Sequence, residues 1–136
     1  MTAQFDTDGL HATVPLAAQL GIRVVSAAPE AVRLEIDWRE ELCTAAGVLH
    51  GGVLMSLADT AGAVCTVLNL PEGATGTTTV ESKTNLLAAV RGGTVIASAR
   101  PLKVGGTLIV VETEMHDAGD RLVAKTAQTQ AVLRNA

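Results

Sequence analysis

The chain has 136 residues, a length that suits one domain with its own hydrophobic core. Its net charge is -4, and Phe5 and Trp38 are its only aromatic residues. Nucleic-acid binding needs basic and stacking side chains, so this composition excludes it. With so few aromatic residues, the core must be built from Val, Leu, Ile and Ala.

The amino-terminal segment carries Asp6 and Asp8 and lacks a basic start followed by an apolar run, so it does not have the pattern of a secretory signal. We expect about residues 1–13 to be flexible. Cys43 and Cys65 do not have the spacing of metal ligands. We therefore expect reduced thiols in a cytoplasmic protein without a bound metal.

A short helix and two strands are predicted in the first third of the chain. Pro15 in the first turn and Gly21 just past the last turn delimit a helix at 14–20. A strand is expected at 22–27. The next strand, at 31–38, alternates apolar and charged residues, which is typical of a half-buried strand.

A loop at 40–49 leads to a long helix at 51–69, which Pro71 ends. The helix is long and apolar enough to resemble a membrane span. Asp59 and the small residues near it favour a helix inside a soluble sheet instead. A helical projection places Asp59 opposite the main apolar stripe, facing either water or another subunit. The small and apolar neighbours of Asp59 favour the second alternative.

Four β-branched runs follow the helix, and glycine-containing turns separate them. The predicted strands are 77–87, 94–104, 107–117 and 121–133. Because their turns are short, consecutive strands are expected to pair antiparallel. The fold class is therefore α+β, with one curled antiparallel sheet wrapped around the long helix in a single domain over residues 1–136.

Three segments resemble one known family. Leu49-His50-Gly51-Gly52 opens the long helix, Leu57-Ala58-Asp59-Thr60-Ala61 continues it, and Thr79-Val80-Glu81 lies on the next strand. With the order of elements over about residues 16–133, the chain resembles the hotdog-fold acyl-CoA thioesterases of the phenylacetate-pathway (PaaI-like) type. This resemblance implies hydrolysis of an aryl or short to medium alkyl acyl-CoA, without a cofactor.

The resemblance also implies a role for each matching residue. The backbone N–H of Gly51 would hold the thioester carbonyl, Asp59 would be the catalytic carboxylate, and the Thr79 hydroxyl would position the acid or a water. In the family these groups come from two subunits, so a homodimer with shared active sites is implied, assembling further to a homotetramer. The remaining residues assigned to substrate binding are Gly52, Ser56, Thr78 and Val80.

Some assignments stay open. Asp59 could act as a nucleophile or as a general base for water. His50 could orient the donor loop, it could touch the acyl carbonyl, or it could simply cap the loop. Thr44 stands where family members often have an asparagine that orients the water or the carbonyl. The catalytic role expected of Thr44 would therefore depend on its hydroxyl, on a side chain that is shorter than asparagine and lacks the amide. The cations Arg91, Arg100 and Lys103 are candidates for contacts with coenzyme A phosphates, and none of them is preferred.

Two other functions fit the same fold. A dehydratase or hydratase of acyl thioesters would use an acid and a histidine across the acyl β-carbon. A non-catalytic acyl-CoA-binding module would keep the glycines but would not need Asp59. A plain structural dimer leaves Asp59 unexplained.

Overall fold

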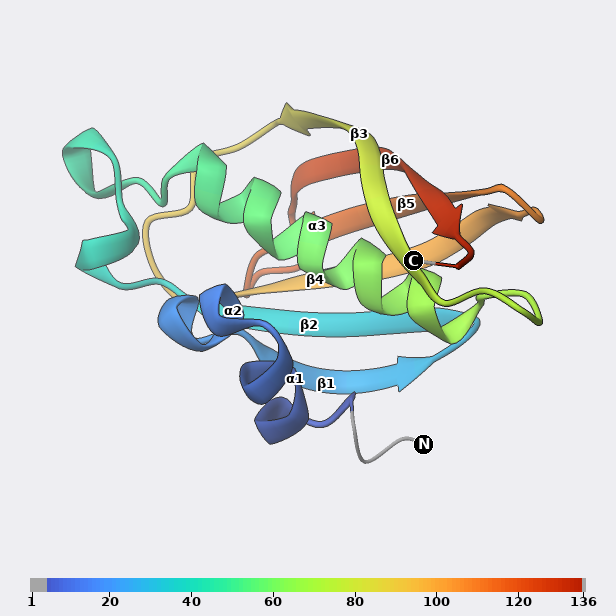
Figure 1. The fold of residues 1–136 in the computed structure, drawn as a ribbon. Coiled ribbons are helices and arrows are strands. Elements are labelled where there is room, and N and C mark those ends of the chain that lie inside the picture. The colour runs from blue at the N-terminus through green and yellow to red at the C-terminus, as the bar shows by residue number, and fades with distance from the viewer. Residues whose placement is uncertain (1–4, 136) are drawn as a thin grey trace.

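The computed structural model describes residues 5–135, and it consists of one antiparallel sheet curled around a long helix, α3 (Gly51–Leu68) (Figure 1). The six strands have the spatial order β1-β2-β4-β5-β6-β3. Their bounds are β1 (Arg23–Ala28), β2 (Ala31–Asp37), β3 (Gly76–Leu86), β4 (Thr94–Val104), β5 (Leu108–His116) and β6 (Leu122–Leu133). The structure confirms the α+β class and the hotdog fold expected from the sequence.

Most expected elements begin and end within one residue of their predicted limits. Helix α2 (Pro15–Leu20) starts at a proline, and Gly21 ends it with a φ of 73°, a backbone conformation that glycine adopts without steric cost. Asn69 follows α3 as its C-cap, two residues before Pro71. Local signals therefore suffice to place these boundaries.

The amino-terminal segment is more ordered than the sequence analysis expected. Residues 7–13, predicted to be flexible, form helix α1 (Thr7–Thr13), and the Asp6 side chain caps it by accepting a hydrogen bond from the N–H of Gly9 at 2.7 Å. Leu10 on α1 is buried in the core. The burial of Leu10 holds this helix against the core. The helix was not predicted because its seven residues are too few to show a periodic apolar pattern. The first four residues of the predicted flexible segment lie outside the described residues.

The expected pairing of β3 with β4 is wrong. β3 pairs antiparallel with β6 at the edge of the sheet, and β4 pairs with β2 and β5. The connection between β3 and β4 runs over residues 87–93, which can span roughly 23 Å when extended. In the sheet, β3 and β4 are three strand positions apart, which is a distance of only about 14 Å. The connection therefore crosses the end of the sheet, and it is too long to be a tight hairpin turn.

The core lies between the concave face of the sheet and α3. Alternate side chains of β2, β4 and β5 are fully buried against the helix, as the alternating pattern predicts. On α3, Leu57, Ala61 and Cys65 have no exposed surface. By length and composition, α3 is the one helix in residues 5–135 that could cross a membrane, and 44% of it is buried within the fold. Its packing is that of the core helix of a soluble protein.

The loop before α3 is held at several points. It contains two short 3₁₀ turns, Glu40–Leu42 and Ala45–Gly47, and a β-bridge between Cys43 and Leu49. The indole N–H of Trp38 donates to the carbonyl of Gly47 at 3.0 Å. The loop therefore fixes the position at which α3 begins.

Candidate active site

Asp59 lies on the exposed side of α3, next to the edge strand β3. Its Oδ1 accepts two hydrogen bonds, from the Thr79 hydroxyl at 2.8 Å and from the side-chain amide of Gln128 at 3.0 Å. Its Oδ2 has no hydrogen-bond partner among residues 5–135. One oxygen is thus fixed while the other is free to meet a water or a substrate. The sequence analysis disfavoured an exposed side chain here, yet in this single chain Asp59 is exposed.

A chain of hydrogen bonds across β6 and β3 sets the direction of the Thr79 proton. The Gln130 amide donates to the Thr79 oxygen at 2.7 Å, and the Thr77 hydroxyl lies 3.0 Å from the Gln130 carbonyl oxygen. Because Thr79 accepts from Gln130, its own proton is available for Asp59. The network thereby orients the carboxylate before any substrate arrives.

The sequence analysis missed Gln128 and Gln130, which are both fully buried. They occupy alternate positions on β6 and face inward together with Thr126, among apolar residues. Two glutamines at the inward register of a core strand need partners, because an unpaired buried amide is costly. This alternation is the signal that could have revealed them.

Gly62 provides the space that Gln128 occupies. A Cβ at Gly62 would collide with the carboxamide of Gln128, which lies directly against the helix backbone. The Gln128 Oε1 is buried and has no hydrogen-bond partner in the described part of the chain. The absence of a side chain at Gly62 therefore allows the Gln128 amide of β6 to lie against α3 and reach Asp59.

A β-bulge interrupts β3 beside the carboxylate. Thr79 pairs with Gln130 and Glu81 pairs with Thr129, which leaves Val80 as the extra residue. Val80 is 59% exposed, and Thr78 is exposed on the opposite side of the strand from Thr79. The structure thus brings Thr79 to Asp59, but within one chain it does not bring Thr78 there.

The first turn of α3 offers one free backbone donor. His50 is the N-cap residue, and its Nδ1 accepts from the N–H of Gly52 at 2.8 Å. The N–H of Gly51 has no acceptor among the described residues. At a helix N-terminus this N–H also carries positive potential. Gly51 is therefore the donor suited to a carbonyl oxygen, whereas Gly52 is already engaged.

The structure gives the other expected site residues structural contacts. The Ser56 hydroxyl donates to the Gly52 carbonyl at 2.9 Å, so its proton serves the helix backbone. Thr44 is exposed at the start of a 3₁₀ turn, and its N–H bonds the Val48 carbonyl at 2.8 Å. Its hydroxyl has no partner within residues 5–135.

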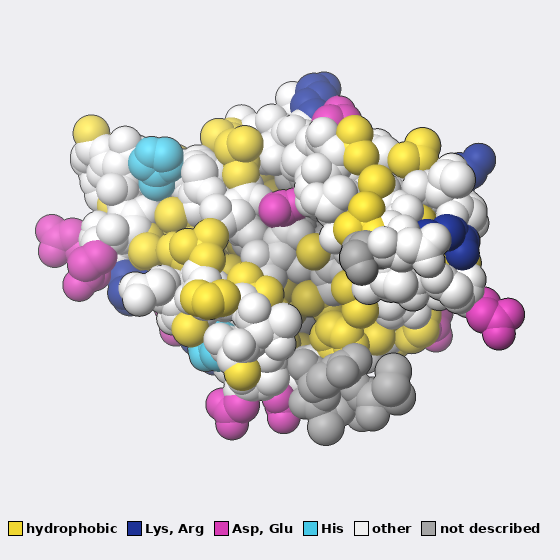
Figure 2. Space-filling model, in the orientation of Figure 1, with side chains coloured by type: hydrophobic (Ala, Val, Ile, Leu, Met, Phe, Trp, Pro, Cys, Tyr) yellow, Lys and Arg dark blue, Asp and Glu magenta, His cyan; other side chains and the backbone are white. Residues whose placement is uncertain are grey.

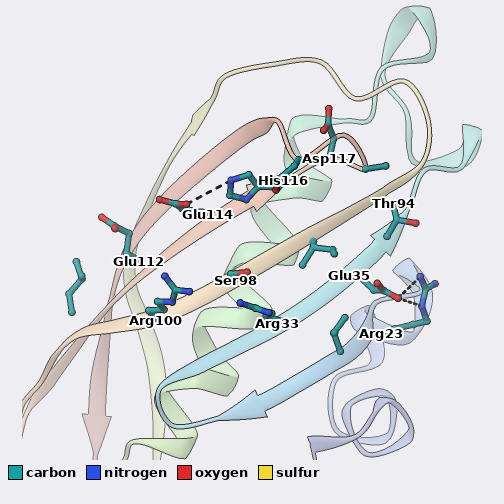
Figure 3. A pocket seen from close by; sticks show the side chains of 15 residues that line it. Arg23, Arg33, Glu35, Thr94, Ser98, Arg100, Glu112, Glu114, His116 and Asp117 are labelled. Atoms are coloured by element: carbon teal, nitrogen blue, oxygen red, sulfur yellow. Dashed lines mark hydrogen bonds and ion pairs between the residues drawn. The ribbon is translucent and has the colours of Figure 1, made fainter.

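A hollow of about 700 Å³ lies on the face of the sheet that is turned away from α3 (Figure 3). Charged side chains line it, and several are paired: Arg23 contacts both Glu35 and Asp37 at 2.8 Å. The hydrogen bond from Arg23, followed by that from Thr94, lowers the pKa of Asp37 to about 2. Because the sheet separates this hollow from Asp59, the two belong to different sites.

The described residues contain no group of three or more His, Cys, Asp or Glu side chains that could hold a metal ion. The groups described at the site are a carboxylate, a hydroxyl, side-chain amides and a helix N-terminus. Asp59 and Gly51 are eight residues apart on α3, which separates them by about 12 Å along the helix axis.

Comparison with known proteins assigns the chain to a family. Residues 46–124, which include the loop end, α3 and the strands as far as β6, match the Thioesterase superfamily. The chain belongs to this superfamily and is a thioester hydrolase of the hotdog-fold, PaaI-like type.

Among its relatives, a candidate esterase of Saccharolobus solfataricus is 33% identical over 115 residues, covering 85% of this chain and 81% of that protein. Acyl-coenzyme A thioesterase 13 of Pongo abelii is 33% identical over 110 residues, covering 80% and 78%. The crystal structure of a thioesterase family protein from Silicibacter pomeroyi superposes with a TM-score of 0.87 at 28% identity, covering 99% and 100%.

Proposed function

We propose that the protein hydrolyses small acyl-CoA thioesters at a site shared by two copies of the chain. The observation that supports this most directly is Asp59, which Thr79 and Gln128 hold through one oxygen while the other oxygen stays open. The similarity to an acyl-CoA thioesterase supports coenzyme A as the thiol part of the substrate.

Hydrolysis of a thioester builds negative charge on the carbonyl oxygen. The free N–H of Gly51 is the donor we assign to that oxygen, and a preorganised donor of this kind is worth about 3–4 kcal/mol. As a general base, Asp59 takes a proton from water while the water oxygen attacks the thioester carbon. The tetrahedral intermediate then collapses and expels the CoA thiolate, which takes up a proton. As a nucleophile, Asp59 instead attacks the thioester carbon and expels the CoA thiolate, which takes up a proton. Water then cleaves the resulting mixed anhydride, which releases the free acid and restores the Asp59 carboxylate.

The distance along α3 favours a shared site. A reacting carboxylate or its water must lie about 3–3.5 Å from the carbonyl carbon. Gly51 and Asp59 of one chain are about 12 Å apart, so one chain cannot supply both groups to one thioester. We therefore assign Asp59 to one subunit of a homodimer and the Gly51 donor to the other.

The surface around Asp59 supports this dimer. The exposed apolar side chains Met55, Val80 and Leu86 lie along α3 and β3, each more than 40% exposed, and β3 is a sheet edge with unpaired backbone groups. Figure 2 shows hydrophobic side chains gathered on both sides of the hollowed face formed by α3 and β3. A second chain packed along this edge would cover them.

For the homotetramer, we assign the contact between dimers to the outer sheet face shown in Figure 3. Arg33 and Arg100 have no ion-pair partner among the described residues, and Glu112, which pairs with Lys125 at 3.3 Å, lies on the same face, so charges of both signs are available for contacts with a second copy. Ile96 and Leu102 add exposed apolar surface there. Both cysteines are free, which is consistent with a cytoplasmic location.

The test measures thiol release from a panel of acyl-CoAs by three variants. Asp59→Asn should lower kcat by about 10²–10⁴-fold without unfolding the protein. Gly51→Pro removes the donor N–H at the first helical position, where proline is tolerated, and should lower kcat by about 10²–10³-fold. His50 has a ψ of 134°, which suits a residue before proline.

Gly51→Ala is the matched control because it keeps the N–H and adds a Cβ against the same movable end of Leu86. It should retain most of the activity that Gly51→Pro loses. Equal activity in Gly51→Pro and Gly51→Ala would refute the assigned donor. Loss of crotonyl-CoA absorbance without thiol release would instead identify a hydratase.

A further inference from the structure

Two arginines without a counter-ion lie in the hollow on the outer face of the sheet, Arg33 on β2 and Arg100 on β4. Neither guanidinium forms an ion pair with a carboxylate in residues 5–135. On the same face, Arg23 and Lys125 each contact two carboxylates. The chain has 14 acidic and 10 basic residues, so two neighbouring cations that stay unpaired require a separate explanation.

The register of the sheet places the two arginines close together. Arg33 is directly opposite Ser98 in the pairing of β2 with β4, and Arg100 lies two residues further along β4 on the same face. Diagonal neighbours of this kind are about 7–8 Å apart, which long side chains can bridge. Figure 3 shows both arginines next to Ser98. The two guanidinium groups can therefore converge on one small ligand.

The acids beside the arginines are neutralised by another cation. Glu112 is directly opposite Arg100 in the pairing of β4 with β5, yet it contacts Lys125 at 3.3 Å. Glu114 lies 3.8 Å from the same lysine. Because Lys125 occupies both carboxylates, they do not compensate the charges of Arg33 and Arg100.

Ser98 adds a third hydrogen-bond donor between the arginines. It is half-buried, and its hydroxyl has no hydrogen-bond partner within the described part of the chain. Asp120, which also lines the hollow, belongs to the turn after β5. That turn follows His116, which is opposite Ile96, four residues along β4 from Arg100. The part of the hollow around Ser98 therefore offers donors and positive charge, which suit an anion.

We propose that Arg33, Arg100 and Ser98 bind a phosphate group, either free phosphate or the phosphate of a nucleotide. A guanidinium offers N–H donors in a planar fork that fits two phosphate oxygens, and a hydroxyl donates one further hydrogen bond. The hollow of about 700 Å³ leaves room for more of the ligand than its phosphate. The sheet separates this site from Asp59, so the inference does not depend on the proposed hydrolysis.

The contact between dimers proposed above covers the same face of the sheet. A phosphate bound there would lie inside that contact, where its charge offsets the arginines of both copies. If the arginines serve only to bind a second copy, Arg33→Gln disrupts the tetramer while the native protein does not bind phosphate. That result overturns the phosphate site.

The test is calorimetric titration of the native protein with inorganic phosphate, adenosine monophosphate and adenosine, in a buffer without phosphate. Arg33→Gln and Arg100→Gln should each weaken the binding of phosphate or of the nucleotide at least tenfold. Both side chains are exposed, so neither substitution should unfold the protein. Arg91→Gln, which removes the same charge from an exposed arginine outside the hollow, is the matched control and should bind as the native protein does.

The ligands distinguish the two sources of the phosphate group. Tighter binding of adenosine monophosphate than of inorganic phosphate, without binding of adenosine, supports a nucleotide. Equal binding of the two supports free phosphate. The proposal is overturned if neither ligand binds, or if Arg33→Gln and Arg100→Gln bind them as tightly as the native protein does. Arg33→Gln should leave thiol release from acyl-CoA unchanged, because Arg33 lies on the face of the sheet opposite Asp59.

Discussion

Gly62→Ala tests whether the contact between β6 and α3 positions Asp59, the carboxylate to which we assign catalysis. Alanine is the better helix former by about 0.8–1.0 kcal/mol, so propensity alone predicts a more stable protein. The new Cβ would collide with the Gln128 carboxamide, however. Overpacking of this kind costs about 1–3 kcal/mol. We therefore expect a net loss of about 0–2 kcal/mol in the free energy of unfolding.

The same collision should lower activity. Gln128 has to move away, which breaks its 3.0 Å hydrogen bond to Asp59. A hydrogen bond to a charged group is worth about 1.5–3 kcal/mol, and 1.36 kcal/mol in the barrier changes a rate tenfold. Gly62→Ala should therefore reduce kcat by at least about tenfold, with little change in KM because the residue does not touch the substrate.

A double-mutant cycle with Gln128→Ala makes the prediction specific. Without the Gln128 amide the collision disappears, so Gly62→Ala should then stabilise the protein by about 1 kcal/mol. Urea unfolding measures the stabilities and thiol release measures kcat. Gly92→Ala is the control, because its Cβ would meet open space. If Gly62→Ala destabilises the Gln128→Ala variant as much as it destabilises the native protein, the collision with Gln128 is refuted as the cause.

Three further predictions concern stability and thiol reactivity. The ion pair with Arg23 holds the pKa of Asp37 in the folded protein at about 2, below its ordinary 3.8. The ionised Asp37 therefore stabilises the folded state above pH 4, and this contribution to the free energy of unfolding is lost as the pH falls through 2. The difference in unfolding midpoint between the native protein and Asp37→Asn should accordingly shrink from pH 5 to pH 2, and a constant difference would contradict this. Burial raises the pKa of the Cys65 thiol to about 11. At pH 8 a thiol reagent should therefore label Cys43 rapidly and the buried Cys65 only after unfolding. Rapid labelling of both cysteines would contradict the burial of Cys65 between α3 and the sheet. The Thr113 hydroxyl is buried without a partner in the described part of the chain, so Thr113→Val should raise the free energy of unfolding by about 1 kcal/mol, and a loss measured in urea would refute this.

The sequence predicted the elements well because their signals are local. Pro15, Gly21 and Pro71 mark helix limits, and alternation marks the strands. The partner of β3 was not predictable in this way. Hairpin reasoning assumes that consecutive strands pair, whereas the segment at 87–93 is long enough to cross the sheet, so only the tertiary packing decides the pairing.

The site shows the same division between local and long-range signals. Asp59 and the glycines of the helix start could be found from the sequence, since an acid in an apolar helix and a glycine pair are unusual where they stand. Gln128 was missed because its partner is 69 residues away, and its importance depends on the register between β6 and β3. The hydrogen bond that occupies the N–H of Gly52 depends on the N-cap conformation of His50, which the sequence alone does not fix.

The central claim is that two chains build each active site, and hybrid dimers test it most directly. Asp59→Asn and Gly51→Pro, each expected to lose at least about 99% of the native activity alone, are produced with different affinity tags, combined by joint refolding or coexpression, and purified as mixed dimers. In a mixed dimer one site receives both substitutions and the other receives neither. Purified hybrids should therefore regain about half of the native activity per dimer. If each site is contained within one chain, both sites of a hybrid carry one substitution, and hybrids as inactive as their parents would contradict the account.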